Sequence, residues 1–190
     1  MTAAEVFVKA SLAVLALGVT LAGVVAATLV NADDWAKRLG DARHDVAPAA
    51  NAQYRTACGE CHMAYQPGLL PAASWQRVMA GLDDHFGDNA ELAPADADVV
   101  RSYLVASAAD RATGHRSHGF SRVGAPAAAP LRITETRYFL GKHDEVPLRF
   151  VRDNPEVRSF ANCPACHQRA EAGSYNEHEV WIPGVGAWDD

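Results

Sequence analysis

Hydrophobic residues dominate the start of the chain, where the 21 positions from Ala10 to Val30 carry no charged side chain. As a helix, a stretch of this length spans about 31 Å, close to the thickness of a bilayer core. We therefore predict a transmembrane helix and assign residues 1–32 to an N-terminal membrane anchor. A cleaved signal peptide ending near residues 30–32 is the alternative, although the run exceeds the usual signal core of about 7–15 residues.

Helical periodicity begins after a polar connector over residues 33–47. One helix is expected from about Pro48 to His62, and the Pro- and Gly-containing stretch 66–71 ends it. A second helix is expected to use Ser74 as its N-cap, and a third to run from Pro94 to about Ala108. The apolar stripe of the second helix comprises Trp75, Val78, Met79, Leu82 and Phe86.

The second half of the chain is less regular. Residues 113–130 are rich in Gly, Pro and Ala and are expected to form a linker, followed by an extended piece within residues 131–140. Pro147 and Pro155 interrupt any long element. A last, short helix is predicted around residues 163–167, ending near Gly173. The pattern thus predicts a mainly α protein whose soluble part divides near residue 112.

Charge limits the classes of partner. The 190 residues include 23 acidic and 17 basic side chains, for a net charge of −6, and the basic residues are scattered. Binding to nucleic acid requires a clustered basic face, so nucleic acid is excluded as a partner. With 49% hydrophobic and 21% charged residues, the composition is that of a folded protein rather than a disordered one.

Two Cys-x-x-Cys-His pentapeptides carry the chemistry, at residues 58–62 and 163–167. This spacing is typical of c-type haem attachment, because two thiols on one helical turn can each bond a haem vinyl group. The following His then reaches the iron as an axial ligand. The sequence predicts two haems, with covalent links at Cys58, Cys61, Cys163 and Cys166 and axial ligands at His62 and His167.

Other uses of four cysteines fit the pattern less well. In a four-cysteine zinc site the pairs are usually about 15–20 residues apart, whereas these pairs are separated by about a hundred. A thiol–disulfide redox pair would be expected within a βαβ pattern, which is lacking. Structural disulfides are a third alternative. None of the three alternatives explains the His that follows each Cys pair.

Haem attachment and the N-terminal segment point to the same compartment. Haems of this type are attached outside the cytoplasmic membrane, so the soluble part is expected to face the periplasm. The sequence predicts a single-pass protein of the cell inner membrane. Residues 33–112 are expected to form the haem 1 domain, and residues 113–190 the linker and the haem 2 domain.

Nothing local to either motif determines the ligand on the far side of each iron. For haem 1, His85 is favoured, with Met79 as the competitor on the predicted apolar stripe. For haem 2, His143 follows an apolar run that could line the haem face and is favoured, with His178 as the alternative. The linker residues His115 and His118 are expected to be exposed.

The sequence resembles a known family in several segments. These are the first pentapeptide with the following residues 63–71 (MAYQPGLLP), residues 81–87 (GLDDHFG), residues 141–147 (GKHDEVP), and the second pentapeptide with residues 176–183 (NEHEVWIP). They resemble the dihaem cytochrome c (DHC) family over roughly residues 48–183.

The resemblance implies a first domain similar to class I cytochrome c and a smaller, irregular second haem domain. It also implies low-potential, low-spin haems with two His ligands each, namely His62 with His85 and His167 with His143. Small monohaem cytochromes and b-type membrane cytochromes are the redox partners that the resemblance suggests. The N-terminal anchor departs from the soluble, exported form of the family.

Three functions are compatible with these features. The leading hypothesis is an electron carrier that passes single electrons between a membrane donor and a periplasmic or membrane acceptor. The second is a haem enzyme, a peroxidase or small-molecule reductase, in which haem 2 has an open position and Glu135, Glu145 or His178 donates protons. The third is a structural or tethering subunit in which the haems serve as folding cores.

Overall fold

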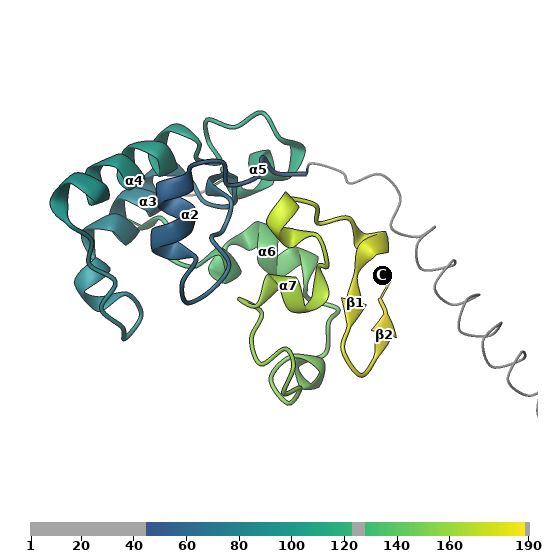
Figure 1. Cartoon of the computed structure of the whole chain (residues 1–190). Coiled ribbons are helices and arrows are strands. Elements are labelled where there is room, and N and C mark those ends of the chain that lie inside the picture. Colours follow the sequence, from purple (N-terminus) through teal and green to yellow (C-terminus); the bar gives the residue numbers. More distant parts are fainter. Residues whose placement is uncertain (1–44, 123–127, 189–190) are drawn as a thin grey trace, which may run out of the picture. The chain divides into compact units, whose positions relative to one another are not determined.

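The computed structural model describes residues 45–122 and 128–188, which lie within one compact unit formed by residues 42–190 (Figure 1). The predicted anchor at residues 10–30 lies outside the described residues. Among the residues that are described, no helix is both long and apolar enough to cross a bilayer. The fold described below is therefore that of the segment that contains both pentapeptides.

Short helices make up most of the structure, as the sequence predicted. The N-terminal part contains α2 (Ala52–Cys58), η1 (Pro67–Leu69), α3 (Ala72–Ala80), η2 (Leu82–Asp84), α4 (Pro94–Ala106) and α5 (His115–Phe120). The C-terminal part contains η4 (Ile133–Glu135), α6 (Arg137–Lys142), η5 (Leu148–Phe150), α7 (Cys163–Cys166), η6 (Ala170–Ala172), η7 (Glu177–Glu179) and a hairpin of β1 (Trp181–Ile182) and β2 (Gly186–Ala187). The two strands pair antiparallel, with Trp181 opposite Ala187.

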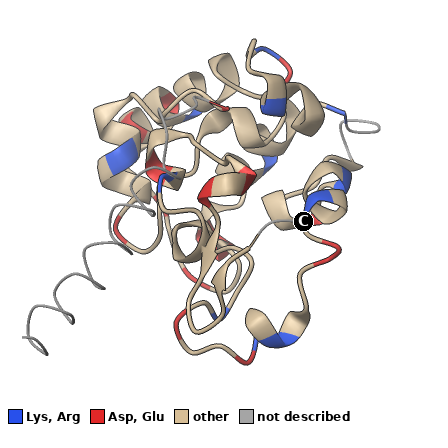
Figure 2. Cartoon of the chain, turned by 90° about the vertical axis from the view of Figure 1, so that its right-hand side faces the viewer, with Lys and Arg blue, Asp and Glu red and all other residues tan. Residues whose placement is uncertain are grey.

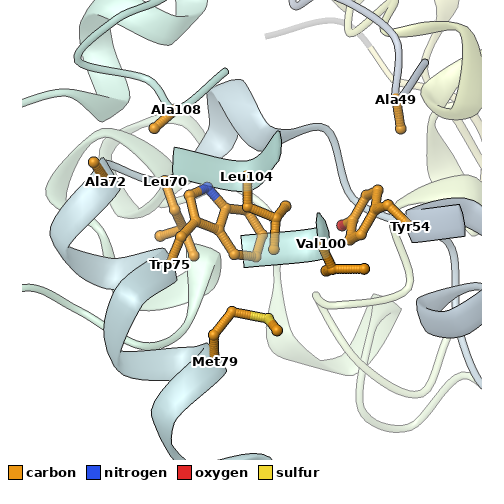
Figure 3. Close-up of a cluster of buried hydrophobic side chains, with 9 residues drawn as sticks. All are labelled: Ala49, Tyr54, Leu70, Ala72, Trp75, Met79, Val100, Leu104 and Ala108. Carbon is orange, nitrogen blue, oxygen red and sulfur yellow. The ribbon is translucent and has the colours of Figure 1, made fainter. Parts of the chain in front are cut away.

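Helix α4 packs against both α2 and α3, and their apolar side chains form the first core. In Figure 3, Trp75 of α3 lies beside Leu104 of α4, and Val100 lies between α4 and Tyr54 of α2. The indole N–H of Trp75 donates to the carbonyl of Pro67 at 2.8 Å, so its one polar atom is satisfied. This core supports the helix that ends at Cys58.

Local chemistry sets the ends of α2, which is shorter than the predicted helix from Pro48 to His62. The Asn51 side chain accepts from the Tyr54 backbone N–H at 2.8 Å, so the helix begins after Asn51 rather than at Pro48. At the other end Gly59 forms the C-cap and leaves no room for a side chain, because a Cβ would lie 2.3 Å from the Arg55 carbonyl oxygen.

The second predicted helix, whose apolar stripe extends to Phe86, differs from α3 at both ends. It begins at Ala72, so Ser74 lies inside it as a fully buried residue and not as its N-cap. It ends at Ala80, and a separate 3-10 turn, η2, carries Leu82. The third predicted helix is confirmed as α4, which starts at Pro94.

After α4, the structure differs from both the predicted linker and the predicted extended piece. Helix α5 occupies residues within the expected linker, because Phe120 packs in a second core with Phe139 and Leu69. The expected extended piece is helical instead. There Thr136 caps α6 by accepting from the Phe139 backbone N–H at 3.2 Å. The last helix, α7, covers only four residues.

Charged residues of both signs lie interspersed along the described elements, as Figure 2 shows. This distribution agrees with the scattered basic residues of the sequence and its net charge of −6.

Candidate functional site

The first pentapeptide and His85 form one candidate site. Cys58 is the last residue of α2, and Cys61 and His62 lie three and four residues after it. The centroids of the His62 and His85 rings are 6.3 Å apart, and the ring planes differ by 26°. A metal–imidazole bond of about 2 Å on each side of one metal would place two ring centroids about 6 Å apart. The two side chains are therefore spaced to bind one iron from opposite faces.

Hydrogen bonding orients His62 for this role. Its Nδ1 lies 2.8 Å from the Met63 carbonyl oxygen, which can only accept a hydrogen bond. Nδ1 therefore carries the hydrogen, and Nε2 keeps the lone pair that binds a metal. The Tyr65 ring stacks on the imidazole at 4.8 Å and fixes its plane.

His85 and its competitor Met79 lie in different surroundings. Met79 is buried in the first core with Trp75 and Val100 (Figure 3). His85 lies on the turn after η2, opposite His62. Partial burial, the nearby His62 and the guanidinium of Arg132 lower the pKa of His85, which favours the neutral imidazole that metal binding needs.

The second pentapeptide forms a corresponding site with His143. Cys163 and Cys166 are the end residues of α7, and His167 is its C-cap. The centroids of the His143 and His167 rings are 6.1 Å apart, but their planes are nearly perpendicular, at 76°. The spacing again suits two ligands on one iron.

Aromatic contacts and one hydrogen bond hold His143 in place. Its Nδ1 lies 3.0 Å from the Phe139 carbonyl oxygen, which leaves Nε2 directed away from that bond. The Phe139 ring stacks on the imidazole at 3.9 Å, and the Phe160 ring meets it edge-on at 5.7 Å. His178, the alternative ligand, lies exposed on η7.

An apolar pocket surrounds the second site. Its volume is about 1110 Å³, including space open to solvent, and both cysteines of the pentapeptide line it together with His143 and His167. Most of the remaining wall is apolar, with Phe139, Val151, Val157, Phe160 and Ile182 among the lining residues. A porphyrin has large apolar faces, so the pocket fits the group that the pentapeptide predicts.

Burial keeps the groups of the second site uncharged. It raises the pKa of the Cys163 thiol to about 11. Burial, the neighbouring His143 and the guanidinium of Arg116 lower the pKa of His167 to about 4. The Nδ1 atom of His167 is buried and finds no hydrogen-bond partner within the described ranges. The neutral imidazole is the form that binds a metal.

A buried polar link between the two sites could not be read from the sequence. Gln66 is fully buried, and its amide donates to the Ala170 carbonyl at 2.6 Å. The Tyr175 hydroxyl donates to Gln66 Oε1 at 2.6 Å, and the Tyr175 ring meets His167 edge-on at 5.3 Å. Tyr65, the residue before Gln66, contacts His62. The dipeptide 65–66 thus touches the surroundings of both proximal histidines.

Tyr65 adds a second connection. Its hydroxyl donates at 2.7 Å to the carbonyl of Ala161, two residues before Cys163. In the sequence, residues 66–71 indicate only a helix break, because the partners of Tyr65 and Gln66 lie about a hundred residues away. No periodic pattern reveals such a contact.

The remaining candidate residues lie outside these two sites. His115 and His118 are exposed on α5, and Glu135 and Glu145 are also exposed. None of the four cysteines, all of which lie in the described residues, forms a disulfide. Within residues 45–122 and 128–188, no three His, Cys, Asp or Glu side chains gather into a group able to hold a metal ion. The arrangement is that of two separate His–His pairs, each next to a Cys pair.

Comparison with known proteins agrees with this arrangement. The sequence profile of the dihaem cytochrome c family matches residues 54–175. The structure is similar to that of a dihaem cytochrome c from Shewanella baltica OS155, with 45% identity and a TM-score of 0.61. The similarity covers 73% of this chain and 98% of that one.

A dihaem cytochrome c from Rhodobacter sphaeroides is also similar, at 42% identity with a TM-score of 0.60, over 68% of this chain and 100% of that one. No match was found among curated protein sequences. The matched region contains both pentapeptides, His85 and His143. The chain therefore belongs to the dihaem cytochrome c family and carries two c-type haems.

Proposed function

We propose that the protein is an electron carrier that passes single electrons through two six-coordinate haems. The observation that carries the proposal is the pair of facing imidazoles at each site, with centroids 6.3 Å apart at site 1 and 6.1 Å apart at site 2. A c-type haem takes up or releases one electron at its iron, and two His ligands give it a low potential.

The residues have the following proposed roles. In site 1, His62 is the proximal ligand and His85 the distal ligand. In site 2, His167 is the proximal ligand and His143 the distal ligand, with His178 as the alternative. The covalent links are made by Cys58 and Cys61 to haem 1 and by Cys163 and Cys166 to haem 2.

Contacts between the two sites support electron exchange within the molecule. The Tyr65 ring lies on His62, and the Tyr65 hydroxyl is bonded to the backbone just before Cys163. The Gln66 side chain is hydrogen-bonded to Tyr175, whose ring touches His167. These contacts hold the two pentapeptides at a fixed separation, which an intramolecular electron transfer requires.

The location and the partners are part of the proposal. Residues 10–30 would anchor the chain in the inner membrane, with the haem segments in the periplasm. The donor would be a membrane redox protein such as a b-type cytochrome, and the acceptor a periplasmic or membrane protein such as a small monohaem cytochrome. The domain boundary near residue 112 remains a prediction from the sequence.

The haem-enzyme alternative needs an iron with an open position. The geometry of site 2 gives it little support, because the His143 and His167 rings both line the pocket at 6.1 Å from each other, a spacing that suits two ligands on one iron. The proton donors that were considered, Glu135, Glu145 and His178, are all exposed.

A redox titration of the purified holoprotein, followed by absorbance, tests the proposal. We expect low-spin spectra in both oxidation states. When carbon monoxide is added to the reduced protein, it should bind only slowly, at a rate limited by the loss of a His ligand. High-spin bands in the wild type, or rapid turnover of peroxide or nitrite, would favour the enzyme. Alkaline extraction of membranes should leave the full chain in the pellet, whereas a variant lacking residues 2–32 and exported by a cleavable signal should be released.

A further inference from the structure

The turn that carries His85 is held mainly by bonds within itself. The His85 backbone N–H donates to the Asp88 carbonyl at 2.7 Å, and the Phe86 N–H donates to the Asp84 carbonyl at 2.9 Å. The Gly87 N–H donates to the Asp84 carboxylate at 3.1 Å. Because these bonds are local, they shape the turn but do not fix its distance from His62. That distance depends on side chains that pack on the turn from outside.

Phe86 is the strained residue of this turn. Its φ is +60°, in the left-handed region that a bulky side chain rarely adopts. Such a conformation persists only where neighbouring groups enforce it. Its side chain is 44% exposed, so the core does not supply the restraint.

Arg132 supplies a restraint from a distant part of the sequence. Its guanidinium carbon lies 3.8 Å from the centre of the Phe86 ring, in cation–π contact. The Phe86 ring lies 4.8 Å from the His85 ring. Arg132 is the N-cap residue of η4, and its Nε lies 3.7 Å from the Glu135 carboxylate. The guanidinium of Arg132 thus lies over one face of the Phe86 ring, and the Phe86 ring is in turn a neighbour of the His85 imidazole.

We propose that Arg132 and Phe86 are positioning residues that hold His85 on the iron of haem 1. The inference rests on His85 being the distal ligand in the proposed function. Arg132 has a second effect through its charge, because a cation near the iron favours the reduced state, which has one positive charge less. The same side chain therefore retains the ligand and raises the reduction potential of haem 1.

Substitutions of Arg132 separate the two effects. In the reduced holoprotein, carbon monoxide binds haem 1 only when His85 leaves, so its binding rate reports how often the turn opens. Arg132→Gln removes the cation–π contact and should raise this rate about two- to fivefold. It should also lower the potential of haem 1. Arg132→Lys keeps the charge but loses the flat guanidinium, so the rate should rise while the potential stays near that of the wild type.

Phe86→Gly tests the aromatic ring. Glycine adopts the positive φ without strain, so the turn itself becomes easier to form. If the ring holds His85, carbon monoxide should nevertheless bind faster than in the wild type. Arg149→Gln is the matched control, because Arg149 lies over the Phe150 ring at 4.6 Å, in a pair that involves neither His62 nor His85. Arg149→Gln should change neither the carbon monoxide binding rate nor the potential of haem 1.

His85→Ala provides the reference for a fully open haem 1. Suppose that Arg132→Gln and Phe86→Gly both keep the wild-type carbon monoxide binding rate and the wild-type potential, while His85→Ala opens haem 1. The positioning role of Arg132 and Phe86 would then be overturned, but His85 would stand as the ligand. An unchanged spectrum in His85→Ala would instead reject His85 as the ligand, and with it the ligation on which this inference depends. The haem content of each variant shows that it has folded and matured.

Discussion

Single side chains at the two sites are held by different means. The Tyr65 ring and the Met63 carbonyl fix His62, and Phe139 provides both the ring contact and the carbonyl for His143. His85 has a neighbour of another kind, an exposed aromatic ring on its own turn. We therefore expect the distal ligand of haem 1 to be the more easily displaced of the two.

Replacing His85 with Ala should leave haem 1 attached through its cysteines but open its sixth position. Reduced protein should then bind carbon monoxide at one haem, with high-spin absorbance bands in the ferric state. Met79→Leu is the matched control, because Met79 is a buried core residue and this change conserves volume. If Met79→Leu opens the iron and His85→Ala does not, the ligand assignment is wrong.

Replacing Tyr175 with Phe should lower the free energy of unfolding by about 1–3 kcal/mol, because it leaves the buried Oε1 of Gln66 without a donor. Denaturant titration of the holoprotein measures this change. Tyr103→Phe serves for comparison, since the Tyr103 hydroxyl bonds the exposed Ala50 N–H and water can replace it there. If both variants lose the same free energy of unfolding, the hydrogen bond to Gln66 contributes no more to stability than an exposed one.

For single residues, the distance in sequence between the members of a site decides whether the site can be predicted from the sequence. The cysteines and the proximal histidines stand together in pentapeptides, so their chemistry can be read directly. Distal ligands can only be chosen from a few candidates, because they come from other elements. The contact of Gln66 with Tyr175 spans 109 positions and has no local signature.

Secondary-structure elements were predictable where caps and periodicity agree. Helix α4 begins at Pro94 as expected, whereas α2 is shorter because Asn51 caps it late and Gly59 ends it early. The region of α5 and α6 was misjudged. Its Gly- and Pro-containing composition suggested a linker and an extended piece, but Phe120 and Phe139 gain enough from burial to order it. Tertiary packing outweighed local preference there.

Gly173 is a turn residue that connects the C-terminal part of the described segment to Val46, near its start. Its φ is +79°, its carbonyl accepts from the Val46 N–H at 3.1 Å, and a Cβ would lie 2.0 Å from the Val46 carbonyl oxygen. Gly173→Ala should therefore destabilise the holoprotein well beyond the conformational cost of about 1–2 kcal/mol. Thermal unfolding followed by circular dichroism measures this loss.

Gly184→Ala provides the control for this prediction. Gly184 has a similar φ of +71°, but no atom lies within 4 Å of a Cβ added there. That variant should lose only the conformational part. Equal shifts in melting temperature would show that the close approach to Val46 can be relieved by small movements.

At the scale of the whole molecule, the apolar volume around site 2 has a consequence for folding. The largely apolar walls of this pocket are left without packing partners unless a group fills it. Protein that lacks haem should therefore unfold without the cooperative transition of the holoprotein. Calorimetry of a variant with all four cysteines replaced by Ser, expressed without haem attachment, tests this. A sharp, native-like transition would contradict it.

The variant with only Cys163 and Cys166 replaced by Ser provides the intermediate case. The buried residues of the first core, built mainly from α2, α3 and α4, do not line the second pocket, although Ile133 packs against that core and also lines the pocket. Haem 1 should remain attached, and the first core should keep part of its cooperativity. Loss of both haems would show that the link through Gln66 makes the two halves fold together.

The imidazole planes differ by 26° at site 1 but by 76° at site 2. In ferric, low-spin iron, the relative orientation of two imidazoles sets the splitting of the d orbitals that share the unpaired electron. Near-parallel rings produce a rhombic electron paramagnetic resonance spectrum with three resolved g values, and near-perpendicular rings produce a single strongly anisotropic low-field feature. The oxidised protein should therefore show both signals in one spectrum, so that each haem can be followed separately by electron paramagnetic resonance.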